Sequence, residues 1–183
     1  TCHVDIYRPM FNTAFSTICL PFDVDLSEAS ANEYKDAKLM RFAGAVIRDI
    51  NKEKMLELQF EITDGQLKAG IPYLIQPQEP ITKIVHLAQQ VSFKSITPED
   101  QEVNFTDGDQ NNSITFKGII PYQQIEVANK PWPLIVVDNN RLAEVSTTGY
   151  INGFRAYFQL AEELEPGTKA AISMRKPTPT NVI

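Results

Sequence analysis

The sequence predicts an all-β protein, an antiparallel β-sandwich or related barrel of about ten to twelve short strands with at most one or two short helices. Three observations favour this class. Twelve prolines and eight glycines are dispersed over 183 residues, which favours short elements and many turns. Several stretches alternate polar and apolar residues, as half-buried strands do. The 43% of apolar residues suffice for one ordinary core, so we expect one domain over residues 1–175.

The first half of the chain is read as strands around one weak helix. Strands are expected over residues 3–8, 14–20, 38–50, 55–62 and 72–77, and residues 26–37 form a short helix or an ordered loop. Ser27 or Asp25 would cap that helix. Gly44 predicts a bulge in its strand, although the same segment also fits the tail of the helix. Because prolines flank the last of these strands, we expect it at a sheet edge or a strand end.

The second half continues with short strands. We expect one or two strands over residues 81–95, and then strands over 113–118, 134–138, 141–145, 149–160 and 169–175. Asn139 and Asn140 fit the central positions of a tight turn between two of them. Residues 176–183 are polar and proline-stiffened, so a tail or linker is expected there rather than core.

The stretch over residues 149–160 has the clearest pattern. Its two alternating sets place Phe154, Ala156, Phe158 and Leu160 on one face and Arg155 and Tyr157 on the other. The first set is apolar and predicts a core face. Gly149 and Gly153 lie where a tight turn or a close backbone approach is needed. We expect Arg155 to pair with a carboxylate or to cap a loop carbonyl, and so to support the fold.

Charge and hydropathy exclude two classes of partner. The formal net charge is −6, and no cluster of Lys and Arg is present, so nucleic-acid binding is not expected. No apolar run approaches the ~20 residues that a spanning helix needs, so this segment is not expected to insert into a membrane. The sequence starts at Thr1 without an initiator Met, which suggests a mature or excised fragment.

The two cysteines leave two alternatives open. Cys2 and Cys19 permit one disulfide, and they would be close together if the first two predicted strands pair. Two free thiols, one of them packed in an apolar strand, are the other interpretation.

Catalytic and metal chemistry have little support. His3 and His86 have no cysteine or carboxylate at metal-ligand spacing, no serine lies in a nucleophile-elbow pattern, and no cofactor motif is present. A non-enzymatic role is therefore expected, with a hydrolase as the weakest alternative. Asp107, Asp109 and Asn111 alternate as in the first half of a calcium loop. The glycine and the glutamate that complete such a loop are missing, so a polar hairpin loop is preferred to a weak Ca²⁺ site.

Aromatic side chains suggest a binding rim. Trp132 is the single tryptophan and lies between two prolines, and Tyr122, Tyr150 and Tyr157 could share its surface. Flat aromatic faces beside polar groups hold sugars or protein partners. The alternative is that Trp132 plugs one end of the sandwich, since large aromatic residues are usually mostly buried.

Five motifs carry a resemblance that covers most of the chain. They are Phe15-Ser-Thr-Ile-Cys-Leu-Pro-Phe22, Gly70-Ile-Pro-Tyr-Leu-Ile-Gln-Pro77, Phe116-Lys-Gly118, Asp138-Asn-Asn-Arg-Leu142 and Ile151-Asn-Gly-Phe-Arg-Ala-Tyr-Phe158. In order and spacing they resemble an uncharacterised β-rich module of secreted and cell-surface proteins of gut Bacteroidetes, often C-terminal to leucine-rich or immunoglobulin-like repeats. Within it, Gly153, Phe154, Arg155, Tyr157 and Phe158 look like a family hallmark. The resemblance implies an extracellular compartment and transfers no catalytic residue.

Two functions follow as expectations. The first is a non-catalytic extracellular structural or interaction module that contacts other domains of the same surface protein, with adhesive or glycan contacts. The second is a carbohydrate- or small-ligand-binding β-sandwich domain. An exposed aromatic groove would distinguish the second from the first.

Overall fold

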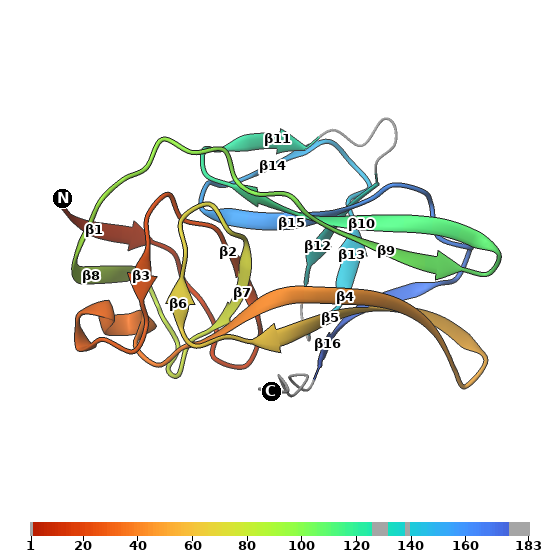
Figure 1. Ribbon diagram of the computed structural model, residues 1–183, viewed down its shortest axis with the longest axis horizontal. Helices are drawn as coiled ribbons and strands as arrows, with labels where there is room; N and C mark the ends of the chain where they lie inside the picture. The colour runs from red at the N-terminus through yellow and green to blue at the C-terminus, as the bar shows by residue number, and fades with distance from the viewer. Residues whose placement is uncertain (1, 126–131, 138–139, 176–183) are drawn as a thin grey trace, which may run out of the picture.

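The computed structural model describes residues 2–125, 132–137 and 140–175, and it is an all-β, sandwich-like structure as predicted. Its described residues form sixteen strands and one short 3₁₀ helix, η1 (Ala29–Tyr34). Two five-stranded sheets face each other, with β10 and β15 above β4 and β5 in Figure 1. The predicted tail over residues 176–183 and Asn139 lie outside the described residues.

The strands of each sheet come from distant parts of the chain. The first sheet has the order β13-β12-β15-β10-β9, with β9 (Gln101–Asp107), β10 (Gln110–Ile119), β12 (Trp132–Val136), β13 (Leu142–Glu144) and β15 (Arg155–Leu160). The second has the order β16-β5-β4-β7-β2, with β2 (Ser16–Ile18), β4 (Lys38–Ile50), β5 (Glu53–Ile62), β7 (Tyr73–Gln76) and β16 (Lys169–Met174).

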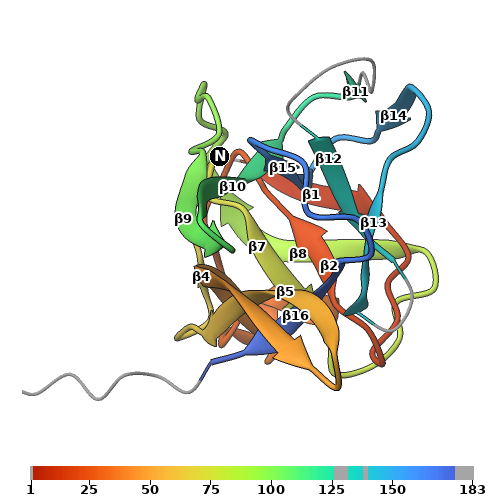
Figure 2. The same cartoon turned by 90° about the vertical axis from the view of Figure 1, so that its right-hand side faces the viewer.

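Three two-stranded ribbons complete the fold. They pair β1 (Cys2–Tyr7) with β8 (Ile84–Val91), β3 (Val24–Asp25) with β6 (Gln66–Leu67), and β11 (Gln123–Ile125) with β14 (Gly149–Ile151). Figure 2 shows the β11–β14 ribbon extending above the first sheet, away from β4 and β5. This ribbon gives the outer face of the first sheet a partial cover.

Four phenylalanines form the centre of the core between the sheets. Phe42 and Phe60 come from the second sheet, and Phe116 and Phe158 come from the first. Phe116 and Phe158 stack with ring centroids 4.4 Å apart, and Phe60 meets both rings edge-on. Such aromatic pairs contribute about 0.5–1.5 kcal/mol each beyond their buried area. The predicted apolar face of the aromatic stretch is therefore correct from Ala156 to Leu160.

A second core lies at the end of the sandwich where β1, β8 and η1 pack. Leu39 and Ile75 of the second sheet point into it, whereas Met40 and Leu74 point into the core between the sheets. Strands β4 and β7 are thus buried on both faces at this end. That explains why Tyr73, Leu74 and Ile75 form a continuous apolar run instead of an alternating one.

Two expectations about sheet order are wrong. Strand β7 lies between β4 and β2 and is not an edge, because its flanking prolines fall outside the paired residues and remove no ladder bond. Strand β16 runs parallel to β5, with Ile172 opposite Leu58, so the second sheet is not purely antiparallel. Parallel neighbours require a long crossover, and here the whole first sheet separates the two strands along the chain.

The predicted aromatic strand is two strands. Residues 149–151 pair with β11, the chain then turns, and β15 starts only at Arg155. Phe154 has a φ of +61°, a rare conformation for a bulky residue, and it contacts the second core instead of the first. Strand β9 was not predicted, because its exposed polar residues conceal the alternation of Val103 and Phe105.

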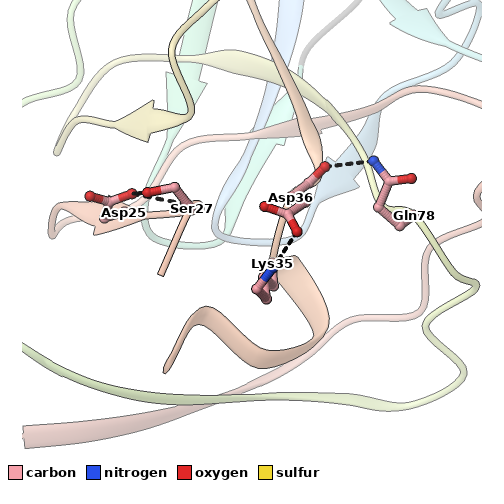
Figure 3. A network of polar contacts seen from close by, with 5 residues as sticks. All are labelled: Asp25, Ser27, Lys35, Asp36 and Gln78. Atoms are coloured by element: carbon pink, nitrogen blue, oxygen red, sulfur yellow. Dashed lines mark hydrogen bonds and ion pairs between the residues drawn. The ribbon is translucent and has the colours of Figure 1, made fainter. Parts of the chain in front are cut away.

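The N-cap of the short helix differs from the one that the sequence predicted. The N-cap of η1 is Glu28, which makes no side-chain cap hydrogen bond, so the expectation for Ser27 or Asp25 is wrong. Asp25 Oδ1 accepts hydrogen bonds from Ser27 N at 2.9 Å and Ser27 Oγ at 2.6 Å (Figure 3). After the helix, Gln78 Nε2 donates to the Asp36 carbonyl at 2.6 Å, which ties the entry of β4 to the loop after β7. Gly44 lies at a register shift in β4, as predicted.

Candidate functional site

Two tyrosines form an exposed stacked pair on the β11–β14 ribbon. The rings of Tyr122 and Tyr150 are nearly parallel, at 11°, with centroids 4.9 Å apart. Each residue is 61% exposed although both are large and aromatic. The pair, here called the tyrosine platform, comes from two segments that β11 and β14 bring together by antiparallel pairing, with Gln124 opposite Tyr150.

Beside the platform lies an open polar cavity of about 320 Å³. Tyr150 forms part of its wall, so the platform and the cavity are one continuous feature. The polar groups of the wall belong to Arg8, Ser16, Thr17, Asn152 and Arg155. The apolar part of the wall includes Phe15 and Ile135. We call this feature the arginine cavity. Its size is at the small end of the range for ligand sites.

Arg8 is a buried cation, only 4% exposed. Its Nη1 donates to the Phe154 carbonyl at 2.7 Å, and its Nη2 donates to the Thr17 carbonyl. Both partners are neutral oxygens, and no carboxylate of the described chain pairs with this guanidinium. Burial lowers the pKa of Arg8 to about 10, with the nearby charge of Arg155 as a smaller contribution in the same direction.

Arg155 is the second arginine of the cavity. It begins β15, opposite Ile119, and is partly exposed. Within the described residues, no hydrogen bond or ion pair holds its guanidinium. The expectation that Arg155 caps a loop carbonyl is therefore wrong, because Arg8 fills that role from the other end of the chain.

Tyr34 is a buried titratable group close to Arg8. It is fully buried, and its hydroxyl has no hydrogen-bond partner among the described residues. Burial raises the pKa of Tyr34 to about 12, and the charge of Arg8 opposes that rise. A neutral phenol therefore lies near a cation that lacks a counter-ion within the described residues.

Gly153 positions the backbone next to the cavity. A Cβ on Gly153 would lie 2.4 Å from the carbonyl oxygen of Ile120, a distance that real Cβ atoms do not reach. The same carbonyl accepts the N–H of Phe154 at 3.3 Å. The carbonyl of Phe154 in turn accepts Cys19 N–H at 3.3 Å as well as the bond from Arg8. Gly153 thus permits the turn that presents the Phe154 carbonyl to Arg8.

The other predicted rim aromatics lie elsewhere. Tyr157 is 3% exposed and packs with Ile119 and Ile125 beneath the β11–β14 ribbon, so its expected place on an exposed rim is wrong. Trp132 belongs to β12 instead of a loop, is half-buried against the core between the sheets, and lines a separate cavity of about 530 Å³ with Leu142 and Leu164. Trp132 is therefore not part of the surface formed by Tyr122 and Tyr150.

Asp107, Asp109 and Asn111 do not converge. Asp107 pairs with Gln110 across a tight hairpin turn, and alternation along β10 places Asn111 on the opposite face from Asp107. The Asp107 carboxylate is buried and faces Lys54 Nζ at 3.7 Å. The described chain holds no group of three or more His, Cys, Asp or Glu side chains placed to bind a metal ion. The calcium-loop hypothesis is wrong for these three residues.

The cysteines are not bonded to each other. Cys2 is an exposed free thiol in β1, which pairs with β8 instead of β2, and Cys19 is a buried free thiol. Burial raises the pKa of Cys19 to about 12, which makes it a poor nucleophile at neutral pH. The His86 imidazole forms a hydrogen bond with the exposed Asp5, with Nδ1 and Oδ1 2.9 Å apart, and that hydrogen bond raises the pKa of His86.

Sequence reasoning missed Arg8 as a site residue. It follows a predicted strand and precedes Pro9, and nothing in the local pattern distinguishes it from an ordinary exposed arginine. Arg8 follows β1 directly, so its burial depends on which strand pairs with β1. That pairing partner is β8, about eighty residues away along the chain.

Comparisons with known proteins give no assignment. No family model, curated protein or solved structure matches the chain. Among the described residues, no helix combines the length and apolar character needed to cross a membrane. The site must therefore be judged from its geometry.

Proposed function

We propose that this chain is a non-catalytic binding module of a secreted or cell-surface bacterial protein, and that the tyrosine platform is where it holds a carbohydrate. The exposed, stacked Tyr122 and Tyr150 beside a polar cavity carry this proposal. Sugar rings present C–H faces that pack on aromatic rings, while their hydroxyls need nearby donors and acceptors. The cavity supplies such groups from Ser16, Thr17 and Asn152.

The extracellular setting and the neighbouring domains belong to the same proposal. They rest on the five sequence motifs that resemble a module of Bacteroidetes surface proteins. Other domains of the same surface protein would then be structural partners. Two observations support the non-catalytic part. The Cys19 thiol is buried with a raised pKa, and no hydrogen bond joins the exposed His86–Asp5 pair to a Ser, Thr or Cys side chain within the described residues.

A glycan-array screen followed by calorimetric titration of the strongest ligand tests this function. The double variant Tyr122→Ala/Tyr150→Ala is expected to weaken sugar binding at least tenfold, since each contact of a sugar ring with an aromatic face is worth about 1 kcal/mol. Tyr7→Ala is the matched control, because Tyr7 is 76% exposed and lines neither cavity.

The melting temperature must be measured alongside. The double variant is expected to remain folded, because both rings are largely exposed. A folded double variant that binds sugar as tightly as the parent protein would overturn the role of the platform. If no glycan binds the parent protein, the carbohydrate function is wrong and the module is structural.

A further inference from the structure

The arginine cavity has an unbalanced positive charge. Arg8 is nine-tenths buried, and within the described residues its guanidinium bonds only to the carbonyls of Thr17 and Phe154. Arg155 lines the same cavity without a protein partner in the described chain. Buried charges are normally paired, since taking a cation out of water without a counter-ion is costly. Although the net charge of the protein is −6, no described carboxylate pairs with either arginine. The cavity can therefore accept an external anion.

Donor geometry indicates the kind of anion. A guanidinium has five N–H donors in a planar fork, and Arg8 uses two nitrogens for carbonyls while Arg155 uses none in the described chain. Such forks match the planar, two-oxygen geometry of a carboxylate. Around them, Thr17 and Asn152 offer uncharged polar groups, and Tyr150 forms part of the wall.

We infer that the arginine cavity binds the carboxylate of a uronic acid residue, with the sugar ring extending onto the tyrosine platform. This inference rests on the proposed function and names its ligand class as acidic glycans. The volume of about 320 Å³ suits one monosaccharide. Because Tyr150 belongs to both features, a ring anchored at Arg155 lies next to the stacked tyrosines.

The probes are sodium glucuronate, glucose and sodium acetate, titrated into the full chain with binding followed by NMR chemical-shift changes. Glucuronate is expected to bind at least tenfold more tightly than either glucose or acetate. Glucose lacks the carboxylate and acetate lacks the ring, so each removes one half of the recognition. Raising the salt concentration should weaken glucuronate binding and leave glucose unaffected.

Arg155→Gln is the decisive variant, because no hydrogen bond or ion pair holds the Arg155 guanidinium within the described residues. It is expected to weaken glucuronate binding at least tenfold, as a lost charge-assisted hydrogen bond does. The glucuronate affinity of Arg155→Lys should lie between those of the parent protein and Arg155→Gln, since lysine keeps the charge and loses the planar fork of donors. Arg41→Gln is the control, because it removes one arginine charge from the other sheet, where Arg41 pairs with Glu61.

The outcomes separate this inference from the proposed function. Unchanged glucuronate binding in Arg155→Gln, or equal binding of glucuronate and glucose, overturns the carboxylate site while sugar binding stands. Equal binding of acetate and glucuronate overturns the uronic acid assignment. If Arg155→Gln weakens glucuronate binding while the tyrosine double variant does not, the anion site stands and the platform is wrong.

Discussion

The Arg8 guanidinium donates a 2.7 Å hydrogen bond to the carbonyl oxygen of Phe154, across 146 residues of chain. A second bond from Arg8 reaches the Thr17 carbonyl, so one side chain holds β2 against the turn that precedes β15. These strands belong to different sheets. Arg8 is thus a link between the two layers as well as a wall of the cavity.

Replacing Arg8 should therefore cost stability where replacing Arg155 does not. Arg8→Met keeps most of the stem volume but leaves two buried carbonyls without their donor, and we expect a loss of about 1–3 kcal/mol in the free energy of unfolding. Removal of the buried charge offsets part of the cost. Arg155→Gln should change stability by less than about 0.5 kcal/mol. Urea unfolding measures both, and a more stable Arg8→Met would contradict the link.

Gly153 should tolerate no side chain. Gly153→Ala is expected to lower the free energy of unfolding by more than about 2 kcal/mol, because the new Cβ would collide with the Ile120 carbonyl and the backbone must shift. Gly149→Ala is the matched control from the same stretch, where the nearest atom would be 3.8 Å away. Thermal unfolding of both variants is the measurement. Equal melting temperatures would refute the close approach.

Thiol counting tests the state of the cysteines. With no reductant present, Ellman's reagent should detect one thiol, Cys2, in the native protein and both Cys2 and Cys19 after denaturation. The buried Cys19 reacts only when the core opens, because the reagent cannot reach it and its raised pKa keeps it protonated. A disulfide would instead give no reactive thiol in either state. Cys2→Ala should remove the native signal completely.

Alkaline pH should destabilise the protein through Cys19. Its folded pKa of about 12 lies above the ordinary value of 9.0, so its contribution to stability is complete below pH 9 and is lost as pH rises towards 12. At pH 10 the loss is about 1 kcal/mol. We expect the melting temperature to fall between pH 8 and pH 10.

The Cys19→Ala variant isolates this effect. It should melt lower at every pH because of the cavity it creates, but its melting temperature should change less from pH 8 to pH 10. Cys2→Ala should keep the dependence of the parent protein. Identical pH profiles for Cys19→Ala and the parent would assign the alkaline loss to other groups. Tyr34 and Arg8 contribute mainly above pH 10, and they act in opposite directions there.

Local patterns were sufficient for the class and for most elements. Alternation over residues 55–62 predicted the inward side chains Leu56, Leu58 and Phe60, all buried, and it failed only at Ile62, which is 54% exposed at the strand end. Gly44 predicted a bulge, and prolines and glycines marked turns. These features depend on interactions between residues close together in the chain, which a single sequence displays directly.

Residues that meet only through long-range pairing could not be read from the pattern. The parallel register of β16 on β5, the interior place of β7 and the burial of Tyr157 all follow from how distant strands are ordered, and many orders suit the same alternation. The candidate site is of this kind as well. Arg8 follows β1 and Arg155 begins β15, yet the two line one cavity, and Tyr122 meets Tyr150 because β11 pairs with β14.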